Sequence, residues 1–124
     1  MCSSFVSQGV SLSIVKTEIK ELTKLLTEFR DARDWAQFHN GKDLALALNI
    51  EASELLELFL WKDADQADRD RVAEELADVF AYAFLLAEKY NLDVADIVKR
   101  KVEQNGAKYP VDKAKGSAKK YDEL

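Results

Sequence analysis

The chain has very little cysteine, proline and glycine: one, one and four of 124 residues. The single cysteine, Cys2, allows no internal disulfide and no cysteine-based zinc site, which excludes a disulfide-stapled secreted scaffold and indicates a reducing cytoplasm. So few glycines and prolines cannot supply the turns of an all-β sandwich. No apolar run approaches the roughly 18 residues of a membrane span, and no signal-peptide pattern is present. We therefore expect a cytoplasmic, all-α protein that makes no contact with a membrane.

Length and composition predict one domain over residues 1–124, with a flexible N-terminus (about 1–11) and a basic tail (about 109–124). The net charge of −5 hides an asymmetry, because residues 99–120 carry a net +6 and the rest of the chain −11. A nucleic-acid polymer is not the expected partner, since the chain as a whole is acidic. A small polyanion suits this charge pattern better.

Hydrophobic periodicity predicts four helices, over residues 15–34, 43–61, 70–90 and from Asp93 to about Gly106. Asp43 and Asp93 are expected N-caps, Asn91 is expected to close the third helix, and Gly106 suits a C′ position. The second and third helices are apolar around most of their circumference. Because so small a chain cannot cover them, the fold class that we expect is a four-helix-bundle-type subunit completed by oligomerisation, most simply a homodimer.

Two pairs of acids interrupt the apolar stripes of these helices. Glu51 and Glu54 lie on one face of the second helix, and Glu75 and Asp78 on one face of the third. If the helices pack as an antiparallel hairpin, the pairs meet, and four like charges then require raised pKa values, partner cations or bound metal. Oxygen-only ligands favour Mg²⁺, with Mn²⁺ as a possible substitute.

Other interpretations of these acids are open. A Glu-x-x-Glu on a helix is commonly a solvated face, and a helical dimerisation module without catalysis would use the acids only to solubilise a groove. A di-iron bundle needs Glu-x-x-His pairs, and His39 is the only histidine.

Flat side chains and cations complete a candidate nucleotide site. Trp35, Phe38 and Trp61 could stack on a base, and His39 could hydrogen-bond a base edge. Trp61 falls on the same expected stripe as Glu51 and Glu54. Tyr82 continues the stripe of the third helix, and Lys42 could reach a phosphate or face solvent.

The acidic signature, with twenty residues between its two pairs, resembles that of the MazG-like, all-α nucleoside triphosphate pyrophosphohydrolases. The segments 33–39, 58–62, 108–110 and 116–121 (RDWAQFH, LFLWK, KYP and GSAKKY) are similar to the dCTP pyrophosphatase branch of that family. The likeness extends from about Glu28 to Leu124.

The resemblance implies hydrolysis of a nucleoside triphosphate to the monophosphate and pyrophosphate, with Mg²⁺ at Glu51, Glu54, Glu75 and Asp78 as metal-binding and catalytic residues. Either Glu51 or Glu54 would orient or deprotonate the attacking water. The expected substrate is dCTP or a modified dCTP, and the alternative is dUTP or a broad noncanonical set.

The resemblance also implies further contacts. It places phosphate and metal-adjacent contacts at the end of the fourth helix, on Lys101, Asn105 and Lys108. Its members include tetramers, so a dimer of dimers is possible.

Overall fold

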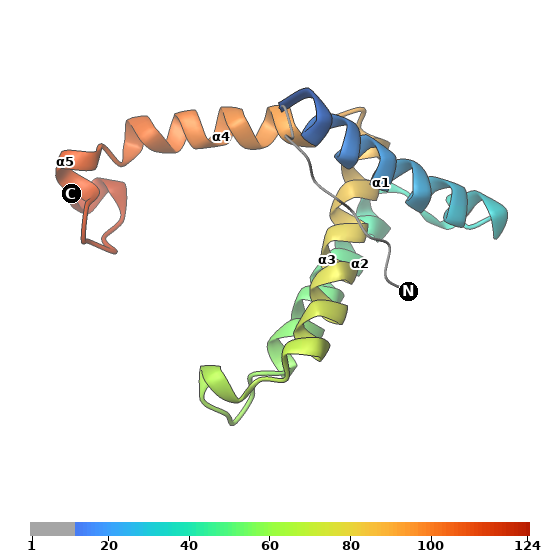
Figure 1. Cartoon of the computed structure of the whole chain (residues 1–124), viewed down its shortest axis with the longest axis horizontal. Coiled ribbons are helices and arrows are strands. Elements are labelled where there is room, and N and C mark those ends of the chain that lie inside the picture. Colours follow the sequence, from blue (N-terminus) through green and yellow to red (C-terminus); the bar gives the residue numbers. More distant parts are fainter. Residues whose placement is uncertain (1–11) are drawn as a thin grey trace. The chain divides into compact units, whose positions relative to one another are not determined.

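The protein is described by a computed structural model over residues 12–124, with side chains described from residue 18. The elements in chain order are α1 (Leu12–Ala32), α2 (Gly41–Glu57), α3 (Arg69–Lys89), α4 (Val94–Lys108) and α5 (Val111–Ala114) (Figure 1). Three short 3₁₀ turns lie at Ala36–Phe38, Ala64–Gln66 and Tyr121–Glu123. No strand occurs in residues 12–124, so the all-α prediction is confirmed. The expected flexible N-terminus, about 1–11, lies outside the described residues.

The described chain divides into two compact units. The first ends at Asn91 and the second comprises Leu92–Leu124, and each is described by itself. The single domain over residues 1–124 therefore stays a prediction. No helix within residues 12–124 is long and apolar enough to cross a membrane.

α2 and α3 form a helical hairpin that carries the buried core of the first unit (Figure 1). Leu44 of α2, Leu58 just after it, and Leu85 and Ala87 of α3 are buried. α1 packs against α3, and Arg30 Nη1 donates to Glu88 Oε2 at 3.3 Å across this contact. The antiparallel hairpin is the arrangement that brings the two acidic stripes face to face.

The ends of α2 differ from the prediction. Its N-cap is Asn40 rather than Asp43, because Asn40 Oδ1 accepts a hydrogen bond from the Asp43 backbone N–H at 2.8 Å. The helix ends at Glu57 rather than near Trp61. The apolar residues that follow form turns, and the chain reverses at Trp61, whose φ of 61° is left-handed.

The third and fourth helices follow the prediction more closely. α3 runs between the N-cap Asp68 and Tyr90, and Asn91 then adopts a left-handed φ of 53°. Asp93 caps α4 as predicted, its Oδ1 accepting from the Asp96 backbone N–H at 2.9 Å. The prediction for Gly106 was wrong: it lies inside α4, which continues for two more residues to Lys108.

The basic tail of the second unit, about 109–124, contains regular structure. α5 follows Pro110, and a turn at Gly116, where φ is 77°, leads to the final 3₁₀ turn. The rings of Tyr109 and Tyr121 meet edge to face, with centroids 6.2 Å apart and an interplanar angle of 84°. The last residues of this unit are therefore held against the end of α4.

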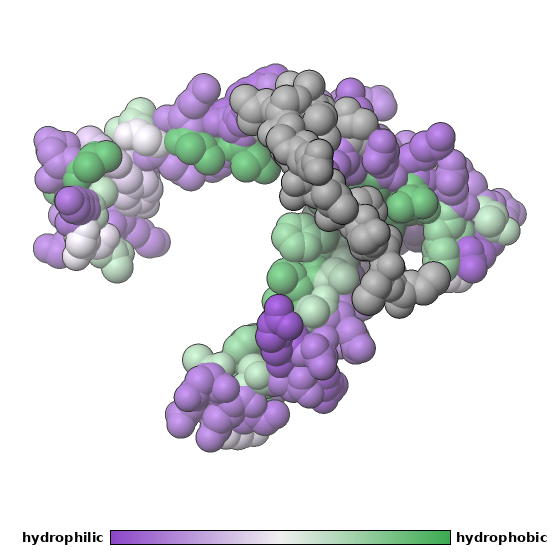
Figure 2. Space-filling model, in the orientation of Figure 1, coloured by the Kyte–Doolittle hydropathy of each residue, from purple (hydrophilic) through white to green (hydrophobic). Residues whose placement is uncertain are grey.

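Many large apolar side chains of the first unit stay exposed in the single chain. The members on α2, α3 and the turn after α2 are Leu46, Ile50, Leu56, Leu60, Leu76 and Phe80. Figure 2 shows apolar surface in green along this hairpin. This exposure agrees with the apolar circumference read from the sequence.

Candidate active site

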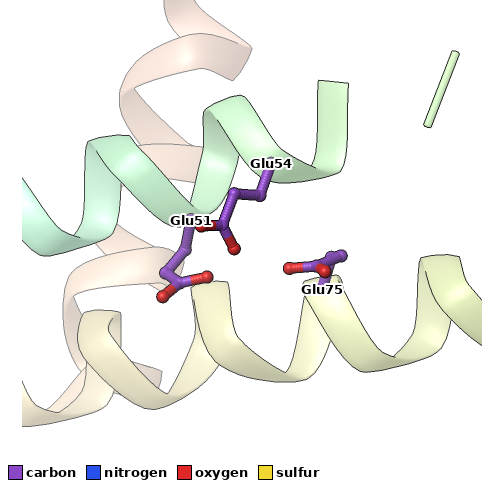
Figure 3. Close-up of side chains that lie close together, drawn as sticks. All are labelled: Glu51, Glu54 and Glu75. Atoms are coloured by element: carbon purple, nitrogen blue, oxygen red, sulfur yellow. The ribbon is translucent and has the colours of Figure 1, made fainter. Parts of the chain in front are cut away.

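Three carboxylates from two helices converge in the α2–α3 hairpin (Figure 3). Glu51 and Glu54 stand one turn apart on α2, and Glu75 faces them from α3. One oxygen of each lies within 4.8 Å of the others. The three-residue spacing puts the α2 pair on one helix face, and the hairpin places Glu75 opposite them. The structure thus brings together three of the four acids singled out in the sequence; we call them the acid cluster.

Asp78, the fourth acid, is not one of the three carboxylates that converge. It is exposed and stands one turn after Glu75 on α3. Its negative charge raises the pKa of Glu51, of Glu75 and of the Tyr82 phenol, so its carboxylate is close enough to act on all three. Asp78 is therefore an exposed residue that adds negative charge to the acid cluster.

The acid cluster is electrostatically unfavourable by itself. Burial, the hydrogen bond with Glu54 and the neighbouring negative charges, in that order, together raise the pKa of Glu51 to about 7. Burial and the same Glu54 neighbour also raise the pKa of Glu75. Glu51 Oε2 and Glu75 Oε2 are buried without a hydrogen-bond partner among the described residues. Two buried acceptors without donors need a proton or a cation.

The donor set fits a hard divalent cation. All candidate ligand atoms are carboxylate oxygens, which Mg²⁺, Mn²⁺ and Ca²⁺ prefer, and no nitrogen or sulfur ligand is part of the cluster. The two unpartnered oxygens belong to facing helices. Glu51, Glu54 and Glu75 could therefore hold a divalent ion, with Asp78 beside it.

An aromatic pair adjoins the acids. The rings of His39 and Tyr82 are 6.5 Å apart at 65°, and burial, followed by the charges of Glu51 and Asp78, raises the pKa of Tyr82. His39 Nδ1 is buried without a hydrogen-bond partner in the described part of the chain. Tyr82 thus lies near both the acids and His39, whose Nδ1 could accept a hydrogen bond from a ligand or donate one to it.

The two tryptophans lie in different surroundings. Trp35 packs edge-on against Phe29 of α1, with ring centroids 5.8 Å apart. Trp61 is 100% exposed and stands beyond the end of α2, so it does not share a helical stripe with Glu51 and Glu54 as the sequence had suggested. The ring contacts of the described residues place neither tryptophan on the His39–Tyr82 pair.

The candidate phosphate contacts belong to both units. Lys42 is exposed in the first turn of α2, about 13 Å along the helix from Glu51 at 1.5 Å per residue. Lys101, Asn105 and Lys108 are exposed on α4, in the second unit. Lys108 Nζ lies 5.0 Å from the centroid of the Tyr121 ring, a cation–π contact within that unit.

Sequence reasoning gave no role to Arg71, which stands one turn before Glu75 on α3. The structure shows that its positive charge lowers the pKa of Glu75, against the other influences there. The spacing of four residues between Arg71 and Glu75 was the signal available in the sequence.

Comparison with known proteins shows the family to which the chain belongs. Residues 46–124, which include all four acids, match the MazG-like family. The chain belongs to the MazG-like family. This MazG-like chain is 39% identical to dCTP pyrophosphatase 1 of Bos taurus over 114 residues, which cover 86% of this chain and 68% of that protein. It is likewise 39% identical to dCTP pyrophosphatase 1 of Homo sapiens, over 86% of this chain and 67% of the human one.

A solved structure carries the same fold. A pyrophosphatase from Archaeoglobus fulgidus superposes with a TM-score of 0.71 at 39% sequence identity, over 75% of this chain and 93% of the archaeal one. MazG-like pyrophosphatases generally depend on a divalent metal ion, and the acid cluster of this chain could bind one.

Proposed function

We propose that this chain hydrolyses dCTP, or a modified dCTP, to the monophosphate and pyrophosphate with Mg²⁺ as the cofactor. The enzyme class is that of a nucleoside triphosphate pyrophosphohydrolase, as the family and its dCTP pyrophosphatase relatives support. The observation that carries the proposal is the acid cluster with its two buried, unpartnered oxygens. Mn²⁺, with the same preference for oxygen ligands, is a possible substitute.

The reaction breaks the phosphoanhydride between the α- and β-phosphates. Water supplies the oxygen that completes one product, and its two protons pass to the products or to solvent. A bound divalent ion would neutralise phosphate charge and help to position water when it is present. Glu51, Glu54, Glu75 and Asp78 are the proposed ligands, and Glu51 or Glu54 orients or deprotonates the water.

The nucleoside end of the substrate is proposed to lie at the aromatic pair. Tyr82 presents a ring beside Glu51 and Asp78, and His39 Nδ1 has no hydrogen-bond partner within the described residues. A buried polar atom of this kind can read a base edge by a hydrogen bond. Trp35 and Trp61 remain proposed stacking residues, and Lys42, Lys101, Asn105 and Lys108 proposed phosphate contacts.

A pyrophosphate-release screen over all common nucleoside and deoxynucleoside triphosphates, with Mg²⁺ and with EDTA, tests the substrate and the metal together. We expect the largest kcat/KM for dCTP or a modified dCTP, and no turnover with EDTA. A preference for dUTP, or equal rates for many triphosphates, would contradict the base assignment. No pyrophosphate from any of them would contradict the function.

The role of His39 has its own test. His39→Ala should reduce the ratio of kcat/KM for dCTP over dTTP, because the base loses a hydrogen-bond partner. His39→Asn, whose amide lies close to the former Nδ1, should retain more of this ratio. An unchanged ratio in both variants would remove His39 from base recognition.

We also propose a homodimer, or a dimer of dimers, in the cytoplasm. The support is the number of large apolar side chains that the hairpin leaves exposed, among them Ile50, Leu56 and Phe80. Sedimentation equilibrium at micromolar concentration should show at least twice the 14.0 kDa chain mass. A folded, monodisperse monomer would contradict this part of the proposal.

A further inference from the structure

Arg71 is the cation with the closest electrostatic link to the acid cluster. It begins the face of α3 that continues, at steps of four, three and four residues, through Glu75, Asp78 and Tyr82. Among the charges that act on Glu51, Glu75 and Tyr82 in the described residues, Arg71 supplies the one positive contribution. Its side chain is thus on the correct face and one helical turn from Glu75.

Arg71 is close to this carboxylate without being paired to it. The ion pairs found within residues 18–124 involve Lys24, Arg30 and Arg100, and no hydrogen bond or ion pair of the Arg71 guanidinium occurs there. The residue is exposed, so its five N–H donors can meet a ligand. A guanidinium that only neutralised Glu75 would be expected to form a direct salt bridge with it.

The two ends of this face of α3 differ in their side chains. Tyr82, in ring contact with His39, lies at one end, the acids lie in the middle, and Arg71 lies toward the α2–α3 connection. From Tyr82 to Arg71 the helix rises about 16 Å at 1.5 Å per residue, a distance comparable with an extended nucleoside triphosphate. If the base of a nucleotide lies beside Tyr82, its terminal phosphates would lie near Arg71.

We propose that Arg71 binds the terminal phosphates of the substrate, those that leave as pyrophosphate, and so fixes the direction in which the nucleotide lies along α3. The planar guanidinium matches two phosphate oxygens at once, which a lysine ammonium cannot do. This inference rests on the proposed function, because it assumes a nucleoside triphosphate at the acid cluster.

The test compares Arg71→Gln and Arg71→Lys with a matched control, Arg69→Gln. Arg69 is an exposed arginine in the same first turn of α3, but two residues away and therefore on another face. Titration calorimetry with Mg²⁺ measures the affinity of each protein for pyrophosphate and, separately, for dCMP. Steady-state kinetics give KM and kcat for dCTP.

Arg71→Gln should weaken pyrophosphate binding and raise the KM for dCTP by about tenfold or more, since charge-assisted hydrogen bonds are lost. The affinity for dCMP should stay within about twofold, because the α-phosphate does not reach Arg71. The pyrophosphate affinity and the KM of Arg71→Lys should lie between those of the wild type and Arg71→Gln. Both quantities should be the same in Arg69→Gln as in the wild type. A purely structural role would lower the unfolding temperature without separating pyrophosphate from dCMP.

Unchanged pyrophosphate affinity in Arg71→Gln would overturn the proposal. So would an equal loss of affinity for dCMP, which would place the α-phosphate at Arg71 and reverse the orientation. If the wild type releases no pyrophosphate from any nucleotide, the proposed function fails by that result alone, while the binding comparison still decides the role of Arg71.

Discussion

The α2–α3 hairpin and the Leu92–Leu124 unit hold their charges in opposite ways. In the hairpin, Glu51, Glu54 and Glu75 converge, and two of their oxygens are buried without a hydrogen-bond partner in the part of the chain that the structure describes. In the second unit the charged side chains are exposed except that of Asp96, which is half-buried, and those with contacts meet local partners, as Arg100 meets Asp96 and Lys108 meets Tyr121. Converging buried charge is unfavourable unless a ligand compensates it, whereas exposed paired charge costs little.

This difference supports the proposal that the hairpin is the reactive part of the molecule, and it leaves the second unit as the basic part of the chain. The acids need a proton or a cation to be stable together, and the substrate proposed for them is itself a polyanion. The second unit holds the whole of the basic segment 99–120, whose net charge is +6. Changes in the two units should therefore affect different quantities: turnover and metal binding for the first, nucleotide affinity for the second.

The largest effect is expected from removing single charges of the hairpin. Glu51→Gln, Glu54→Gln, Glu75→Gln and Asp78→Asn should each reduce kcat by about 100-fold or more, because each removes a metal-directed charge without changing volume. Circular dichroism should show unchanged helicity. The control is Glu74→Gln, an exposed acid next to Glu75 whose charge is not among those that shift the pKa of Glu51, Glu75 or Tyr82. Near-full activity in any two of the four variants would contradict the metal-site assignment.

A smaller effect on binding is expected at Trp61. If its exposed indole stacks on the base, Trp61→Ala should weaken substrate binding by roughly 1–3 kcal/mol, the range for base–aromatic contacts. Trp61→Phe, which keeps a flat ring, should lose less. Since Trp61 is 100% exposed in the single chain, stability should hardly change. Equal KM values for the wild type and Trp61→Ala would exclude stacking by this residue.

The second unit offers a several-fold effect through its tail. Truncation after Tyr109, or Tyr121→Ala in the whole chain, removes the ring beside Lys108 Nζ. If Lys108 contacts phosphate, either change should raise KM for dCTP several-fold with little change in kcat, because the ordered position of the ammonium is lost. Tyr121→Phe keeps the ring and should behave as the wild type. An unchanged KM in the truncated enzyme would show that the tail does not assist binding.

The sequence predicted the helices better than their ends, and the acids better than the residues around them. Periodicity places α1 to α4 because the buried faces repeat every three or four residues, and the same repetition aligns Glu51 with Glu54. The predicted end of α2 was wrong. The apolar run 58–61 has the composition of a helix, but its backbone forms turns and reaches a left-handed φ at Trp61. Residue composition does not reveal where such a turn begins.

The surroundings of the acids depend on packing between distant segments. The contact of His39 with Tyr82 joins residues more than forty positions apart, and no local pattern indicates it. Asn40 rather than Asp43 caps α2 because either side chain suits the position chemically and backbone geometry decides. Arg71 was visible on the α3 stripe, but its importance follows only from the absence of a paired carboxylate among the described residues.

The smallest expected effect is a change of a few degrees in the unfolding temperature of the metal-free protein with pH. The pKa of Glu51 is about 7 in the folded chain and 4.5 as its ordinary value, so between these the folded state binds more protons than the unfolded state. Stability should therefore rise as pH falls from 8 toward 5 and level off below about 4.5, where this group is protonated in both states. Mg²⁺ competes with the proton, so it should raise the unfolding temperature more at pH 8 than at pH 6.

Two controls test this explanation. Glu51→Gln should weaken the dependence of the unfolding temperature on pH and on Mg²⁺, and NaCl at matched ionic strength should not reproduce the effect of Mg²⁺. A metal-free protein that becomes steadily less stable from pH 8 to 6, with the same response to Mg²⁺ at both values, would contradict the charge repulsion inferred for the acid cluster.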